Sequence, residues 1–123
     1  MNRLFILRLS IFFPLLMATA TTHANDFVEL VLSCEKCHGK NGNSTNPDVP
    51  IIAGFSYEGF LNTIEVFRED YRIALKFQRP GEPETVMNDI AKDLSDEDVK
   101  NLAEYFSERD FEPAQQDVNT DLA

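Results

Sequence analysis

Two cysteines and a histidine stand close together in the segment Cys34-Glu35-Lys36-Cys37-His38. The chain of 123 residues contains no other cysteine. Two thiols separated by two residues can form two thioether bonds to a haem, and the imidazole that follows them can ligate the haem iron. Within one helical turn the two sulfur atoms project to the same side. The segment therefore predicts a covalently attached haem, whose planar ring needs apolar walls.

Three other roles are open to the same two cysteines. A disulfide between Cys34 and Cys37 would close a very small loop and stabilise little. A thioredoxin-like redox pair is expected beside a βαβ pattern, which the sequence lacks. A zinc site usually has four protein ligands, so carboxylates would have to complete a set of two thiols and one imidazole. Haem attachment is favoured, because the motif, the export signal and the supply of ligands agree.

The first 24 residues have the pattern of a secretory signal peptide. Arg3 and Arg8 supply a positive start, Leu9–Met17 is an apolar run, and Thr22-His23-Ala24 offers a cleavage site with small residues. An uncleaved membrane anchor is the alternative, but the run contains a proline and is shorter than the ~20 residues that a spanning helix requires. We therefore expect cleavage after Ala24, export to the periplasm, and a mature chain without a membrane span.

Met87 is the only methionine that remains once residues 1–24 are removed. A thioether is a usual soft ligand for the second axial position of a haem iron, and a His/Met pair raises the reduction potential. Met87 follows the proline- and glycine-bearing segment Arg79–Pro83, which can fold over the far side of a planar ring. The alternative is that Met87 is an ordinary core residue. We expect His38 and Met87 to be the two iron ligands.

The chain is acidic, with 21 Asp and Glu against 11 Lys and Arg and a formal net charge of -10. Removal of the signal peptide, which contains two arginines, makes the charge -12. A nucleic-acid-binding protein needs a basic face to neutralise phosphates, so the charge argues against this class. An anionic membrane surface is disfavoured for the same reason. The length allows one domain, which we place at residues 25–110, between the signal peptide and a polar C-terminal tail at 111–123.

Apolar residues recur at helical spacing along most of this domain. The predicted helices are residues 25–38, 56–75, 85–92 and 95–109. Ser56 is a plausible cap, and Ser95 opens a capping-box-like start for a helix that buries Val99, Leu102, Ala103 and Phe106. Gly39–Pro50 is rich in glycine, proline and asparagine and is expected to be a loop. No period-two alternation is sustained, so the prediction is an all-α fold of three or four helices.

Four basic residues lie along the middle helix and beyond it, at helical spacing: Arg68, Arg72, Lys76 and Arg79. On a continuous helix they would form a basic stripe. For most of the stripe we favour a solvated helix face balanced by acidic neighbours. For Arg79 we consider a more specific hypothesis, in which its guanidinium pairs with a haem propionate.

Several segments of the chain resemble a known family. They cover roughly residues 27–106 and are Cys34–Gly39, Gly42-Asn43-Ser44, Pro50–Gly54, Phe67-Arg68, Met87–Ala91, Leu94–Asp98 and Leu102–Phe106. In them the chain resembles the class I c-type cytochromes, in particular the small bacterial periplasmic kind. In Arg79-Pro80-Gly81, in the Met87 segment and in the run after Phe106 it looks most like the cytochrome subunit of flavocytochrome c sulfide dehydrogenase.

The resemblance implies a cytochrome c-like fold, in which helices wrap around one haem and the first and last helices cross. It implies that Cys34 and Cys37 bind the haem covalently, with His38 as the proximal ligand and Met87 as the distal one. Pro50 would lie against the haem on the histidine side, where a backbone carbonyl of its loop can accept the imidazole N–H.

Together these features predict a periplasmic mono-haem cytochrome that carries one electron between redox proteins. The protein would set the potential of its haem c and exclude water, and it is not expected to catalyse a reaction alone. The alternative is the electron-accepting subunit of a flavoprotein dehydrogenase, similar to a sulfide dehydrogenase. A haem-based ligand sensor is a third class, and it requires Met87 to be displaceable.

Overall fold

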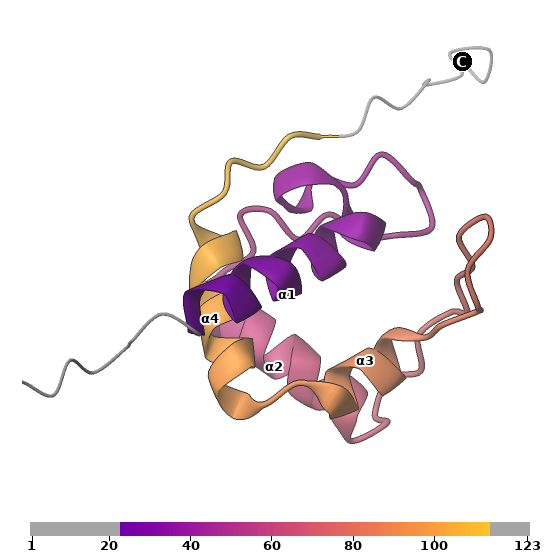
Figure 1. Cartoon of the computed structure of the whole chain (residues 1–123). Helices are drawn as coiled ribbons and strands as arrows, with labels where there is room; N and C mark the ends of the chain where they lie inside the picture. Colours follow the sequence, from indigo (N-terminus) through magenta and orange to yellow (C-terminus); the bar gives the residue numbers. More distant parts are fainter. Residues whose placement is uncertain (1–22, 114–123) are drawn as a thin grey trace, which may run out of the picture.

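The computed structural model describes residues 23–113, and in this part of the chain the fold is all-α (Figure 1). The elements are α1 at His23–His38, a 3-10 turn η1 at Lys40–Gly42, α2 at Tyr57–Arg68, α3 at Met87–Asp93 and α4 at Asp96–Ser107. The β structure among these residues is one isolated antiparallel bridge, between Phe77 and Thr85. The predicted fold class is confirmed.

Two predictions about the chain ends fall largely outside the described residues. Residues 1–22, most of the predicted signal peptide, and residues 114–123 of the predicted tail are not described. Between residues 23 and 113, no helix is both long and apolar enough to cross a membrane.

Serines open two of the helices, as predicted. The Ser56 hydroxyl accepts a hydrogen bond from the Gly59 amide at the start of α2 (3.2 Å). At the start of α4 the Ser95 hydroxyl accepts from the Asp98 amide (3.1 Å), and the Asp98 carboxylate accepts from the Ser95 amide (3.3 Å). This reciprocal pair is a capping box, which satisfies amides that have no partner inside the helix. It fixes where α4 begins.

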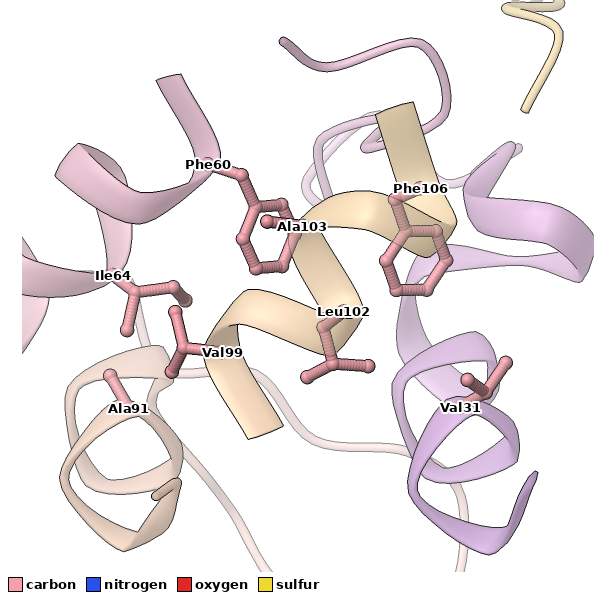
Figure 2. Packing of buried hydrophobic residues seen from close by; sticks show 8 residues of the cluster. All are labelled: Val31, Phe60, Ile64, Ala91, Val99, Leu102, Ala103 and Phe106. Atoms are coloured by element: carbon pink, nitrogen blue, oxygen red, sulfur yellow. The ribbon is translucent and has the colours of Figure 1, made fainter. Parts of the chain in front are cut away.

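The helix α4 lies at the centre of the hydrophobic core (Figure 2). All four predicted core residues of α4 are buried, and they form one cluster with buried residues of the other three helices: Val31, Phe60, Ile64, Ala91, Val99, Leu102, Ala103 and Phe106. The Phe60 and Phe106 rings stack with 6.1 Å between their centroids. In Figure 1 α1 passes across α4, and Phe27 of α1 meets Tyr105 of α4 edge to face at 6.1 Å.

The middle helix α2 ends at Arg68, whereas sequence spacing predicted that it would continue to Leu75. This prediction is wrong. Asp70 adopts a left-handed conformation with φ 56°, through which an α-helix cannot continue. The Asn88 side chain of α3 donates hydrogen bonds to the carbonyl oxygens of Phe67 and Arg72, which a longer helix would have used internally. A contact from a distant segment therefore replaces the last turns of the predicted helix.

The basic stripe does not form on a continuous helix, because only Arg68 of its members lies on α2. Arg68 also departs from the solvated role, since its side chain is only 17% exposed. Its Nε donates to the Ala91 carbonyl (2.9 Å), its Nη2 to the Leu94 carbonyl (2.6 Å) and its Nη1 to the Asp96 carboxylate (2.8 Å). Arg68 thereby holds the end of α3 and the start of α4 against α2.

A short hairpin of residues 77–85 extends away from the helices between α2 and α3 (Figure 1). The amides of Phe77 and Thr85 each donate to the carbonyl of the other residue, both at 2.8 Å. At the tip the Glu82 amide donates to the Arg79 carbonyl (3.1 Å), and the side chains of these two residues form an ion pair. The prolines and glycine of this segment predicted a loop, but they did not predict the pairing of its two arms.

The chain after α4 is tied back to the loop that follows the cysteine motif. The Asn43 Nδ2 donates to the Asp110 carbonyl (2.9 Å), and its Oδ1 accepts from the Glu112 amide (2.8 Å). Residues 111–113 are exposed, yet the hydrogen bond of the Glu112 amide holds their backbone in place. The tail predicted from Phe111 onward therefore begins with an anchored segment.

Gly42 leaves no room for a side chain. It has φ 81°, and a Cβ there would lie 2.9 Å from both the Ala53 nitrogen and a ring carbon of Phe106. We expect Gly42→Ala to lower the free energy of unfolding by about 3 kcal/mol, from backbone strain and overpacking together. Gly81→Ala is the matched control, because Gly81 also has φ 81° but a Cβ added to it would meet no atom within 4 Å, and this variant should lose only about 1 kcal/mol. Urea unfolding midpoints measure both losses, and equal losses would contradict the steric explanation.

Candidate haem site

The cysteine motif forms the last turn of α1, which ends at His38. Gly39 follows with φ 78°, and its amide donates to the Glu35 carbonyl (2.9 Å). A glycine is required at this point, because positive φ is strained for other residues and a Cβ on Gly39 would collide with the Asn43 carbonyl. The chain therefore leaves the helix directly after the histidine, and Cys34, Cys37 and His38 share its last turn.

The His38 ring is fixed by the loop that follows the motif. Its Nδ1 lies 2.8 Å from the carbonyl oxygen of Pro50. A carbonyl oxygen can only accept, so Nδ1 carries the proton and Nε2 keeps a free lone pair. Burial lowers the pKa of the His38 imidazole, although the hydrogen bond to Pro50 raises it in part. The neutral ring that results is the form that can ligate a metal.

The two thiols are free and half-buried. Burial, which is the largest effect, raises the pKa of the Cys34 thiol to about 11, and the neighbouring Ser33 side chain lowers it in part. Reactive redox cysteines show the opposite shift, because their thiolate is stabilised. Burial around Cys34 therefore opposes formation of its thiolate, and no disulfide joins Cys34 to Cys37 in this structure.

The zinc alternative needs carboxylates close to the motif. Among residues 23–113 there is no group of three or more His, Cys, Asp and Glu side chains arranged to hold a metal ion. The carboxylate within the motif, that of Glu35, is used elsewhere, since its Oε1 accepts from the Asn41 amide (2.9 Å). The donors that the motif does offer are two thiols and one neutral imidazole, a set that fits a haem.

Met87 is the first residue of α3 and is partly buried against the hydrophobic core. The end of α1, which carries His38, and the start of α3, which carries Met87, lie toward the same side of the molecule in Figure 1. A thioether sulfur is a weak hydrogen-bond acceptor and a soft metal ligand. The Met87 side chain therefore offers the chemistry that the second axial position of a haem iron needs.

Large apolar side chains are exposed between α2 and the hairpin. Tyr71, Ile73 and Leu75 are 81%, 71% and 82% exposed. Exposed apolar side chains gathered in one short segment mark a surface that something else covers. A haem is a large planar apolar group, so these residues together with the donor set fit it.

Arg79, the predicted partner of a haem propionate, lies at the tip of the hairpin and pairs there with Glu82. Sequence analysis missed the roles of two polar residues, one on α3 and one that binds the end of α3. Asn88 is buried with a hydrogen-bonded amide, and Arg68 was assigned to a solvated face. No local pattern marks Asn88, because its partners lie between 14 and 21 residues away in the chain.

Comparison with known proteins gives consistent matches. The family model for cytochrome c matches residues 27–109. Cytochrome c-554(548) of Halomonas halodenitrificans is 31% identical over 78 residues, which are 63% of this chain and 86% of that protein. Cytochrome c4 of Stutzerimonas stutzeri is 32% identical over 97 residues, which are 74% of this chain but only 43% of that protein.

A further relative, from Stutzerimonas stutzeri, carries the name thiosulfate dehydrogenase electron acceptor. It is 30% identical over 74 residues, which are 60% of this chain and 31% of that protein. The chain thus spans most of the length of one relative and less than half of the length of the others named here. The all-α fold, the cysteine motif at the end of α1 and the family match over most of the described residues agree, and the chain belongs to the cytochrome c family of electron carriers.

Proposed function

We propose that this protein is a periplasmic mono-haem c-type cytochrome that carries one electron at a time. Cys34 and Cys37 would hold one haem c through two thioether bonds, since the sequence contains a single Cys-x-x-Cys-His motif. The haem supplies the one-electron chemistry when bound, and the protein contributes binding, orientation and the exclusion of water.

The observation that carries this proposal is the hydrogen bond between His38 and Pro50. A ring held through Nδ1 presents Nε2 in a fixed direction, and this outer partner also raises the basicity of the ligating nitrogen. The same turn of α1 holds two free thiols. A histidine that only filled space in a core would not need two adjacent thiols and an oriented lone pair.

Met87 is the proposed second axial ligand. It is the only methionine after residue 24, and it stands at the start of a helix that packs on the core. A His/Met pair raises the reduction potential, which suits an electron carrier. Arg79 remains the proposed partner of a haem propionate, because a guanidinium has five N–H donors and the pairing with Glu82 leaves several of them free.

A second candidate function, that of an electron acceptor for a dehydrogenase, is suggested by the relative named thiosulfate dehydrogenase electron acceptor. An electron acceptor of a dehydrogenase takes electrons from an enzyme, and the present chain would do so as the cytochrome partner of a flavoprotein or a related dehydrogenase. Co-purification tests this: a flavin-containing chain that elutes with the cytochrome at physiological salt supports the dehydrogenase role. A cytochrome that elutes alone and exchanges electrons with several redox proteins supports the free carrier.

The experiment that tests the main proposal is spectroscopy of the purified, exported protein. One iron per chain, haem that stays with the denatured polypeptide, and a weak absorption band at the red edge of the visible in the oxidised state are expected. The absorption spectrum of the reduced protein should not change when carbon monoxide is added, because a methionine sulfur would occupy the sixth coordination position of the iron. Prompt carbon monoxide binding would contradict His/Met ligation and favour a ligand sensor.

A further inference from the structure

The side chain of Asn88, next to Met87, is buried and fully hydrogen-bonded. It is 4% exposed. Its Nδ2 carries two hydrogens and shares them among three acceptors, the Phe67 carbonyl (2.9 Å), the Asp70 carboxylate (3.0 Å) and the Arg72 carbonyl (2.8 Å). Its Oδ1 accepts from the Ala74 amide (2.8 Å). One amide therefore binds four points of the segment 67–74, the stretch that replaces the last turns of the predicted helix.

The segment 67–74 depends on these bonds for its shape. Asp70 has φ 56°, a left-handed conformation that aspartate tolerates better than most residues and that its side-chain hydrogen bonds help to hold. Lys92 lies one helical turn after Asn88 on α3, and its Nζ binds both oxygens of the Asp70 carboxylate (2.9 and 2.8 Å). Two residues on one face of α3 thus converge on Asp70.

The helix α3 has only seven residues, so it is too short to be stable by itself. Its first turn is held by Asn88, and its last turn is held by Arg68, which binds the Ala91 and Leu94 carbonyls. The place of α3, and with it the place of Met87, is therefore set by hydrogen bonds to α2 and to the segment after it, together with the packing of Ala91 in the core. Of these bonds, those of Asn88 lie closest to Met87 in the chain.

We propose that Asn88 is a positioning residue for the Met87 sulfur, which makes Met87 a persistent ligand instead of an exchangeable one. The inference rests on the proposed role of Met87 as an iron ligand. Without the Asn88 bonds the first turn of α3 can leave the segment 67–74, and conformations in which the sulfur lies off the metal become populated. An external ligand competes with the sulfur for one coordination position, so its apparent affinity rises with the population of those conformations.

The test is the affinity of imidazole for the oxidised holoprotein, followed through the loss of the weak red band. We expect Asn88→Ala to bind imidazole at least about tenfold more tightly than wild type, since about 1.4 kcal/mol changes an equilibrium constant tenfold and the substitution removes several buried hydrogen bonds. Carbon monoxide should also begin to bind the reduced variant. Imidazole affinity that stays at the wild-type value would overturn the inference.

Asn43→Ala is the matched control. Asn43 is also an asparagine whose amide binds two distant backbone groups, but those groups belong to the chain after α4. Its loss should lower the thermal midpoint and leave imidazole affinity unchanged. An equal rise in imidazole affinity in both variants would show a general loosening of the domain and would overturn a specific role for Asn88.

Two further variants separate the inference from the function on which it rests. If Asn88→Ala does not yield folded holoprotein, Asn88→Ser replaces it, because serine retains a short hydrogen-bonding group. Asn88→Ser should show a smaller rise in imidazole affinity. An imidazole affinity equal to that of wild type in Asn88→Ser would refute the proposal. Met87→Leu tests the ligand itself. A red band that survives in Met87→Leu overturns the proposed ligation, whereas a band that is lost in Met87→Leu, with imidazole affinity unchanged in Asn88→Ala, overturns only the role of Asn88.

Discussion

Replacing both Cys34 and Cys37 with alanine is expected to release the haem from covalent attachment. The wild-type haem should stay with the polypeptide in acidified organic solvent, because two thioether bonds hold it, whereas the haem of the double variant should pass entirely into the solvent. His38 and Pro50 are untouched by these substitutions, so any haem that the variant binds is held by coordination and packing alone. Solvent extraction followed by absorbance of both phases measures the effect.

The single variants are the controls for this experiment. Cys34→Ala and Cys37→Ala should each keep one thioether bond, and their haem should resist extraction while the spectrum of the pyridine complex shifts to that of a haem with one remaining vinyl group. Alanine at either position removes only a half-buried sulfur, so the fold of α1 should survive. Haem that is extracted from the wild type as easily as from the double variant would contradict covalent attachment.

Met87→Leu is expected to lower the reduction potential and to open the iron to carbon monoxide. Axial ligands move haem potentials over about 0.8 V, and methionine lies toward the high end, so a drop on the order of 0.2 V is expected when the sulfur is lost. Leucine has nearly the volume of methionine, so the substitution at this partly buried position should lower the free energy of unfolding by less than about 1.5 kcal/mol. Redox titration and carbon monoxide difference spectra measure the two effects.

A change in potential alone could come from repacking around the haem, so a control without a ligand role is needed. Leu94→Met alters a partly buried residue at the other end of α3 by a similar volume change and should leave the potential and the red band close to those of wild type. A Met87→Leu protein whose potential, red band and response to carbon monoxide all match wild type would remove Met87 from the ligand set.

The parts of this molecule that sequence analysis predicted correctly depend on local signals. The start of α4 follows from Ser95 and Asp98, which lie three residues apart, and its buried face follows from apolar residues at helical spacing. The cysteine motif and the glycine that ends its helix are also contiguous. Interactions within one or two helical turns are visible in a sequence because the geometry of the helix converts spacing into proximity.

The end of α2 was mispredicted because the interactions that decide it are not local. Tyr71 and Leu75 continue the helical spacing, yet the bonds that compete with a longer helix come from Asn88, up to 21 residues away. The solvated role predicted for Arg68 was wrong for the same reason, since its partners Ala91, Leu94 and Asp96 lie 23 to 28 residues further along the chain. Basic residues at helical spacing gave no indication that one of them would bind the backbone of another helix. Tertiary contacts override local preference at these positions.

The tie between Asn43 and the end of the domain bears on the order in which the molecule can fold. Glu112 lies 69 residues after Asn43, and Gly42 packs against Phe106. A polypeptide is synthesised from its N-terminus, so the Cys34–His38 segment is made before α4. Contacts between residues this far apart in the chain form late in folding. The Gly54 amide donates to the Phe106 carbonyl (2.9 Å), so we expect the loop that carries Pro50 to reach its final place when α4 docks. Before that stage the two thiols and the imidazole should be accessible to other reactants.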